Sequence, residues 1–327
     1  MKRLPRIRHI ALGGTISSVS ASESGTVSPT LPGSKMVESI PELAEVAKIE
    51  NCDFPPVASS EITLHQMHLV ALEAARALAD GCDGVVVSQG TDTLEDTAYS
   101  LALMLPRRGS VVVTGAMRPP GVPSSDAEAN LLGAFIVAAS PAAAHVGPLV
   151  VLNDELHCAR FVTKTHTSRL SSFASPNAGR IGEIVERRVH VWWRPAWDDY
   201  LGLPESLAGY AVESVRLGVD ANDAVLRAAT IEGLPSGIVV EGMGGGHVPS
   251  GMLSALDAVL AAGVPVVLAT GRTGPNLQRT YHGPGSETDL MERGVIPAGS
   301  LSTNKARARL LVGLALQRAP AELFPVW

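Results

Sequence analysis

Short apolar runs rich in β-branched residues alternate along this chain with longer amphipathic segments. Such runs are typical of buried parallel strands, and four stand in the first half: Ile7–Leu12, Gly84–Ser88, Ser110–Thr114 and Leu149–Asn153. Between them, Leu64–Ala79 repeats apolar residues at three- and four-residue steps, as an amphipathic helix does. A further helix is expected after Ser125 and as far as Ala139, because Ser125 and Glu128 have capping-box spacing. This order predicts a βαβ series with right-handed crossovers.

A second series of the same kind follows a break in the pattern. From about residue 187 to residue 212, tryptophan, proline and glycine interrupt any regular period, which indicates a domain boundary. Beyond it, the strand-like segments are Val215–Val219, Gly237–Glu241 and Pro265–Ala269, and the helix-like ones are Asn222–Ile231, Met252–Ala262 and Thr303–Gln317. We therefore predict two α/β domains. The larger, N-terminal and catalytic domain spans residues 1–190 and has a mainly parallel sheet flanked by helices; a linker (191–212) and a smaller C-terminal α/β domain (213–327) follow.

Composition excludes several classes of function. The 327 residues are 46% apolar, and the formal net charge of −6 has no long run of one sign, so the footprint of a nucleic-acid binder is missing. The nine histidines show no HExxH spacing, and neither a GxSxG elbow nor a phosphate-binding glycine loop occurs. We expect a small solute as the partner, and neither a metal nor an organic cofactor.

The cysteines and the N-terminus bear on the compartment. Cys52, Cys82 and Cys158 are widely spaced without a CxxC pair, which favours free thiols in a reducing compartment. The basic N-terminus is followed by a short apolar run without a secretory pattern, and no run has the length of a membrane span. We expect a cytoplasmic protein with no membrane partner.

Hydroxyl and charged residues cluster in the loops that follow the predicted strands, where ligands bind in open α/β sheets. Thr15 follows Gly13 and Gly14, and that segment alone fits a simple β-turn as well as a catalytic loop. Thr91 and Asp92 sit where a helix begins, with more hydroxyls and acids than one cap requires. A threonine hydroxyl needs a proton acceptor before it attacks a carbonyl, and Lys164 is the candidate to assist.

These residues resemble a known family. Ala11–Ile16 is similar to the first signature of the bacterial L-asparaginases, and Gln89–Tyr99 is similar to the second. Segments that resemble the family in the right order are Thr114–Pro119, Val162–Thr165 and Ala298–Arg307. The resemblance implies hydrolysis of L-asparagine to L-aspartate and ammonia through a threonine acyl-enzyme, with glutaminase as a side activity. It also implies a dimer or tetramer whose active site lies between the N-terminal domain of one subunit and the C-terminal domain of another.

The resemblance also implies a role for individual residues. Thr15 matches the nucleophile, while Thr91, Lys164 and Asp92 match a relay in which Asp92 also holds the substrate α-amino group. The substrate contacts that we expect are Ser60 and Glu61 on the α-carboxylate and α-amino group, the backbone at Gly90 and Ala116, and Glu287 reaching into a neighbouring subunit's site. An oxyanion formed from the amide would be stabilised by backbone amides near Thr91 and Ala116.

Two departures from the family leave alternatives open. Many members have a lid tyrosine after the first threonine, but no tyrosine occurs between Thr15 and Tyr99, so Thr26 or a neighbour takes that place and the activator of Thr15 is open. Where some members have asparagine in the C-terminal substrate loop, this chain has Gly244–His247. A related amidohydrolase acting on another amide, a lactam or a tRNA-linked amide is therefore the second hypothesis. A non-catalytic amino-acid binder is the third.

Overall fold

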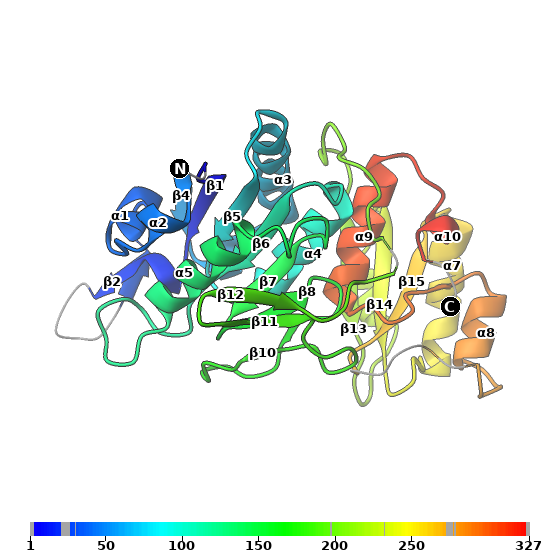
Figure 1. The fold of residues 1–327 in the computed structure, drawn as a ribbon. Coiled ribbons are helices and arrows are strands. Elements are labelled where there is room, and N and C mark those ends of the chain that lie inside the picture. The colour runs from blue at the N-terminus through cyan, green and yellow to red at the C-terminus, as the bar shows by residue number, and fades with distance from the viewer. Residues whose placement is uncertain are drawn as a thin grey trace. The chain divides into compact units, whose positions relative to one another are not determined.

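The computed structural model describes residues 3–20, 27–29, 31–196, 198–231, 233–272, 277 and 279–324. The chain divides into two compact units, Met1–Gly202 and Leu203–Trp327, coloured blue to green and yellow-green to red in Figure 1. Each unit has its own sheet with helices around it, which confirms the predicted pair of α/β domains with the larger one first. No helix within the described ranges is both long enough and apolar enough to cross a bilayer.

The first unit contains a large mixed sheet. Its strands are β1 (Arg6–Gly13), β4 (Lys48–Val57), β5 (Gly84–Ser88), β6 (Ser110–Thr114), β7 (Leu149–Leu152), β8 (Glu155–Cys158), β11 (Gly182–Val185) and β12 (Arg188–Val191). In the described part of the unit these eight strands are ordered β12-β11-β8-β7-β6-β5-β1-β4. The five from β7 to β4 are parallel, and β7, β8, β11 and β12 pair antiparallel. Two small ladders are β2 (Ser18–Ser20) with β3 (Val27–Pro29), and β9 (Thr163–Lys164) with β10 (Phe173–Ala174).

Helices cover both faces of this sheet. They are α1 (Gly33–Glu38), α2 (Leu43–Val46), α3 (Leu64–Ala79), α4 (Leu94–Met104) and α5 (Ala127–Ala138), with 3-10 turns at Thr15–Ser17 and Ser59–Glu61. Neighbouring residues on a strand point to opposite faces, and on β1 Arg8 pairs with Glu73 of α3 while His9 packs edge-on against Phe135 of α5. Hence α3 lies on one face with α4, and α5 lies on the other with α1 and α2.

The crossover through α5 differs in hand from the others. Strands β5, β6 and β7 follow one another in one direction across the sheet, yet α4 and α5 connect them on opposite faces. The connections through α3, through α4 and through α1 and α2 share one hand, which we take as the usual right hand, so the connection through α5 is left-handed. The prediction of right-handed crossovers is wrong at this connection. The reason is packing: α4 already covers β6 and β7 on its own face, and the mostly buried α5 covers them from the other.

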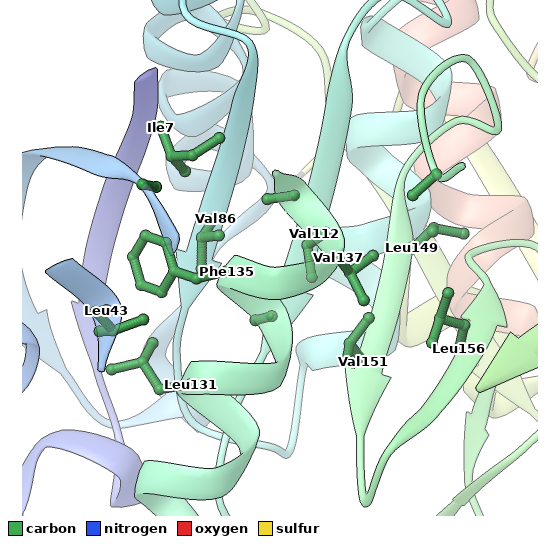
Figure 2. Packing of buried hydrophobic residues seen from close by; sticks show 14 of the residues in the cluster. Ile7, Leu43, Val86, Val112, Leu131, Phe135, Val137, Leu149, Val151 and Leu156 are labelled. Carbon is green, nitrogen blue, oxygen red and sulfur yellow. The ribbon is translucent and has the colours of Figure 1, made fainter. Parts of the chain in front are cut away.

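A hydrophobic core fixes α5 to the sheet. Figure 2 shows Leu131, Phe135 and Val137 of this helix facing the strands and α2. Their buried neighbours include Leu43, Val86, Val112, Val151 and Leu156. Burial of side chains of this size contributes about 1.5–3 kcal/mol each, so α5 is a firmly held support for the polar residues at its start.

The second unit has a smaller parallel sheet of its own. Its strands are β13 (Val212–Arg216), β14 (Gly237–Gly242), β15 (Val266–Thr270) and β16 (Ile296–Pro297), in sequential order. Its helices are α6 (Ala224–Ala228), α7 (Leu253–Ala261), α8 (Glu287–Glu292), α9 (Thr303–Ala315) and α10 (Pro320–Leu323), with a 3-10 turn at Ser250–Met252. A separate apolar core joins the sheet to α6, α7 and α8.

Several element predictions are confirmed to the residue, namely β5, β6 and α3. Others are displaced: the strand expected at Val215–Val219 is β13, which ends at Arg216, and a turn follows in which Asp220 has a φ of 60°. The predicted capping box at Ser125 and Glu128 is wrong. The residue before α5 is Asp126, and its side chain makes no capping hydrogen bond.

Candidate active site

The loops that were expected to meet do so at the carboxyl edge of the parallel strands. Gly13 and Gly14 have φ values of 98° and 82°, which glycine adopts readily. A Cβ on Gly14 would lie 2.0 Å from the backbone nitrogen of Gly90, so the loops after β1 and β5 pack main chain against main chain. This contact places Thr15 and Thr91, the residues that follow the two glycines, at the same edge of the sheet.

Thr91, Lys164 and Asp92 form a compact hydrogen-bonded group. The Lys164 Nζ atom donates to Thr91 Oγ1 at 2.8 Å and to Asp92 Oδ1 at 2.8 Å. The Lys164 side chain is 20% exposed and that of Asp92 is 62% exposed, so the group opens to solvent on its acidic side. The hydrogen bond from Lys164 lowers the pKa of Asp92, desolvation opposes this effect, and a hydrogen bond from Ser59 adds to it. The three side chains form a continuous chain of hydrogen bonds.

Ser59, which the sequence interpretation did not name, is hydrogen-bonded to Asp92. Its Oγ donates to Asp92 Oδ2 at 2.9 Å and accepts from the Asp92 amide at 3.2 Å. Ser59 is buried, whereas Ser60 and Glu61 are exposed in the same 3-10 turn. A Cβ on Gly90 would lie 2.7 Å from Ser59 Oγ, so this serine lies directly beneath the second signature loop.

Lys164 is held by its main chain as well as by its side chain. It lies on β9, a short strand paired with β10. Its amide donates to Glu95 Oε2 at 2.8 Å, and Glu95 lies in the first turn of α4. Glu95 is one of the acids at the start of this helix, and its contact with Lys164 was not predicted from the sequence.

The loop after β6 packs directly against the Thr91 loop. A Cβ on Gly115 would lie 2.7 Å from the Gln89 carbonyl oxygen and 3.2 Å from Thr91 Cγ2. Ala116, expected to contact substrate through its backbone, follows at once and is fully buried. The geometry therefore brings Gly90, Thr91 and Ala116 together.

Thr15 begins a short 3-10 turn and is partly exposed. The turn is held from behind, because Ser17 Oγ and Ser18 Oγ donate to the Gly14 carbonyl oxygen at 3.0 and 2.9 Å. Thr26, expected in place of the lid tyrosine, lies outside the described residues.

Glu287 lies in the second unit, at the start of α8, and is 1% exposed. Its Oε1 accepts from the amides of Thr280 and Tyr281 at 2.7 and 2.8 Å, and its Oε2 lies 3.1 Å from His247 Nε2. Burial raises the pKa of Glu287, but hydrogen bonds from the backbone amides of Tyr281, Thr280 and Glu287, together with the charge of His247, outweigh it and leave the pKa below its usual value. His247 comes from the glycine-rich loop after β14, so the structure joins two features that the sequence showed separately.

The site lacks a recognisable set of metal ligands among the described residues. Within the described ranges, no group of three or more His, Cys, Asp and Glu side chains could hold a metal ion. The site instead offers hydroxyls, one ammonium group, carboxylates and backbone amides. These groups suit the transfer of an acyl group and of protons.

The sequence and fold are similar to those of known proteins. Residues 6–197 match the family model "Asparaginase, N-terminal", and residues 211–324 match "Glutaminase/Asparaginase C-terminal domain". An L-asparaginase of Bacillus licheniformis is 34% identical, over 95% of this chain and 95% of that protein. A component of the glutamyl-tRNA(Gln) amidotransferase of Aeropyrum pernix is 32% identical, over 96% of this chain and 75% of that protein. The crystal structure of a probable cytoplasmic L-asparaginase from Campylobacter jejuni has a TM-score of 0.86 and 28% identity, covering 98% of this chain and 99% of that one.

Proposed function

The chain belongs to the asparaginase family of amidohydrolases, and on that premise we propose that it hydrolyses L-asparagine to L-aspartate and ammonia, with glutaminase as a side activity. The observation that supports this best is the Thr91–Lys164–Asp92 group beside the Thr15 loop. Acyl transfer from a carboxamide needs a nucleophile, a proton path and donors for the developing oxyanion. We assign all three to one edge of the first unit.

The proposed reaction has two halves. Thr15 Oγ attacks the carboxamide carbon, its proton leaves through a neighbouring base, and the C–N bond breaks with a proton delivered to the departing ammonia. Water then attacks the threonyl ester and releases the carboxylic acid, which restores the Thr15 hydroxyl. In this scheme the protons move along the hydrogen bonds that join Thr91 Oγ1, Lys164 Nζ and Asp92 Oδ1. Backbone amides near Thr91 and Ala116 stabilise the oxyanion.

Substrate is gripped at its α-amino and α-carboxylate groups. Asp92 stays ionised and is open to solvent, so it suits an ammonium group. Ser60 and Glu61 remain the proposed partners of the α-carboxylate and α-amino group, and the hydrogen bond from Ser59 to Asp92 supports the same segment as a binding element. Because Ser59 is the residue that contacts Asp92, its truncation is expected to affect binding more than that of Ser60.

Self-association is a further part of the proposal. The Glu287 carboxylate is enclosed by its own unit, whereas the His247 side chain is 38% exposed. We therefore propose that Glu287 contributes to a neighbouring subunit's site in a dimer or tetramer by orienting His247. A cytoplasmic location fits the Campylobacter jejuni relative. Light scattering tests the assembly, and cell fractionation tests the location.

An ammonia-release assay tests the function. The substrates are L-asparagine, L-glutamine and their D-forms, and the variants are Thr15→Ala and Thr91→Val. We expect turnover of L-asparagine by the unmodified chain and its loss in both variants. Thr230→Val, a threonine just after α6 in the second unit, is the matched control and keeps full activity. Wild-type turnover by either active-site variant would contradict the proposed mechanism. Binding of L-asparagine without turnover by the unmodified chain would contradict the proposed hydrolase function.

A second candidate function has specific support. The Aeropyrum pernix relative is a component of a glutamyl-tRNA(Gln) amidotransferase, and the Gly244–His247 loop departs from the asparagine that some members have. The same assay therefore includes bulkier amides and lactams. No turnover of free asparagine together with turnover of a larger amide would favour this alternative.

A further inference from the structure

The left-handed crossover through α5 imposes an unusual path on the loop after β6. The chain leaves β6 at Thr114 and begins α5 at Ala127, on the opposite face of the sheet from α4. Asp126, the last residue before the helix, is 7% exposed and turns its carboxylate back onto this loop. Asp126 Oδ1 accepts from the amides of Met117 and Arg118 at 3.1 and 2.8 Å, and its Oδ2 lies 3.0 Å from the Met117 amide. The first residues of the loop are therefore hydrogen-bonded to its last residue.

Asn130, one helical turn further along, fastens the same loop a second time. Its Nδ2 donates to the Gly115 carbonyl oxygen at 3.0 Å and to Asp126 Oδ2 at 2.9 Å. Its Oδ1 accepts from the amide of Asn153, which follows β7, at 2.9 Å. The side chain is 4% exposed. One buried amide thus joins the loops after β6 and β7 to the start of α5.

This pair of residues acts on the main chain at Ala116. Gly115 lies under Asn130 and also packs against Thr91 and Gln89, so it is pressed between the helix and the second signature loop. Met117 is tied to Asp126, which leaves Ala116 between two fixed neighbours. The helix itself cannot yield easily, because Leu131 and Phe135 are buried in the core shown in Figure 2.

We propose that Asp126 and Asn130 are positioning residues that set the Ala116 main chain against Thr91 for the substrate carboxamide. The proposal rests on the proposed function, since it assigns Ala116 to substrate. Both side chains are buried, so in this proposal they act through the main chain of the loop and not on the substrate itself. A displacement of about 1 Å in such a contact lowers a rate by roughly a hundredfold, so the effect should appear in kcat and much less in KM.

Asn130→Asp tests the proposal in the full chain. It keeps the acceptor for Asn153 but replaces the donor that faces Gly115 and Asp126 with a carboxylate oxygen. We expect kcat on L-asparagine to fall by roughly a hundredfold with KM within about threefold. Relative to the unmodified chain, kcat should recover as pH falls, because a protonated Asp regains an O–H donor. Val137→Ala, a buried change on the same helix away from the loop, is the control for lost stability and keeps kcat.

Hydrogen exchange gives a readout that does not depend on activity. The peptide spanning residues 115–118 should exchange at least about tenfold faster in Asn130→Asp, and no faster in Val137→Ala. Asp126→Asn is the second variant if Asn130→Asp does not fold, because it keeps the acceptor for Met117 and Arg118 while two NH2 groups face each other. Unchanged exchange, or kcat within threefold of the unmodified chain, would overturn the proposal. Fast exchange in a chain whose unmodified form leaves asparagine intact would contradict the proposed function alone.

Discussion

Lys164 is the residue whose loss should cost activity most cleanly. Its Nζ lies 2.8 Å from both Thr91 Oγ1 and Asp92 Oδ1, and its main chain is held separately by Glu95. Lys164→Met keeps the length and removes the proton path, so we expect kcat to fall about 10²- to 10⁴-fold with the fold intact. Lys164→Arg should not restore it, because guanidinium keeps its proton. Steady-state kinetics decide this, with exposed Lys48→Met as the control; near-normal kcat in Lys164→Met would refute the relay.

The lowered pKa of Asp92 leads to a prediction about stability at acid pH. Because its folded pKa is lowered, mainly by Lys164, its contribution to stability is full above the ordinary aspartate value and is lost as pH falls through the lower folded pKa. The free energy of unfolding of Asp92→Asn should therefore differ from that of the unmodified chain by a constant amount above about pH 4, and this difference should shrink below it. Urea unfolding across that range measures it. A difference in unfolding free energy that grows on acidification would contradict a lowered pKa of Asp92 in the folded state.

The sequence predicted that Thr91, Asp92 and Lys164 lie together, but it did not predict all of the residues that hold them. Thr91 and Asp92 stood out because one helix start does not need so many polar groups, and Lys164 because it follows a predicted strand. Ser59 could not be separated from Ser60 and Glu61. The backbone of a single 3-10 turn decides which of three consecutive polar side chains points inward, and no periodic pattern records that choice.

At the scale of elements, local sequence patterns also failed to predict how one helix begins and which hand one crossover has. A capping box of threonine and glutamine exists at Thr63 and Gln66 before α3, while similar spacing at Ser125 and Glu128 is not used. There the Asp126 carboxylate binds the loop after β6 instead of the first helical turn. Which partner wins depends on residues from the rest of the sheet, as does the hand of the α5 crossover, so local patterns cannot decide either.

The contact between the two signature loops predicts the effect of a single methyl group. A Cβ on Gly14 would lie 2.0 Å from the Gly90 nitrogen, and φ there is 82°. Gly14→Ala should therefore separate the loops and lower kcat by at least about a hundredfold. Gly263→Ala is the matched control, since its φ is 80° and its Cβ would meet nothing within 4 Å. It should lose only about 1–2 kcal/mol of stability for the backbone conformation and keep its kinetics. Equal kcat values in the two variants would contradict a role for the contact between the two loops in catalysis.

For the whole molecule, the alternation of strand and helix patterns was enough to predict two α/β units and the central strands. The edges of the large sheet were not predicted. Strand β4 carries Pro55 and Pro56 and alternates between exposed and half-buried residues, so it shows no continuous apolar run. Strands β8, β11 and β12 are short antiparallel additions. Edge strands are specified by pairing with a sheet already formed, and their sequences therefore give a weak signal.

Buried histidines should set the pH dependence of global stability. His9 lies between Asn51 Oδ1 and Ser88 Oγ at 2.9 Å from each, and His157 lies 3.0 Å from Ser175 Oγ. Burial lowers the pKa of both rings. The unfolded chain therefore takes up protons below about pH 6.5 while the folded chain does not, so stability is full above that pH and declines below it.

The expected slope is up to about 1.4 kcal/mol per pH unit for each histidine, between pH 6.5 and its lower folded pKa. Denaturant unfolding from pH 8 to pH 5 measures it, and the double variant His9→Gln, His157→Gln should flatten the curve even though it is less stable at pH 8. Exposed His65→Gln should leave the slope as it is. An unaltered slope in the double variant would mean that other groups govern acid unfolding.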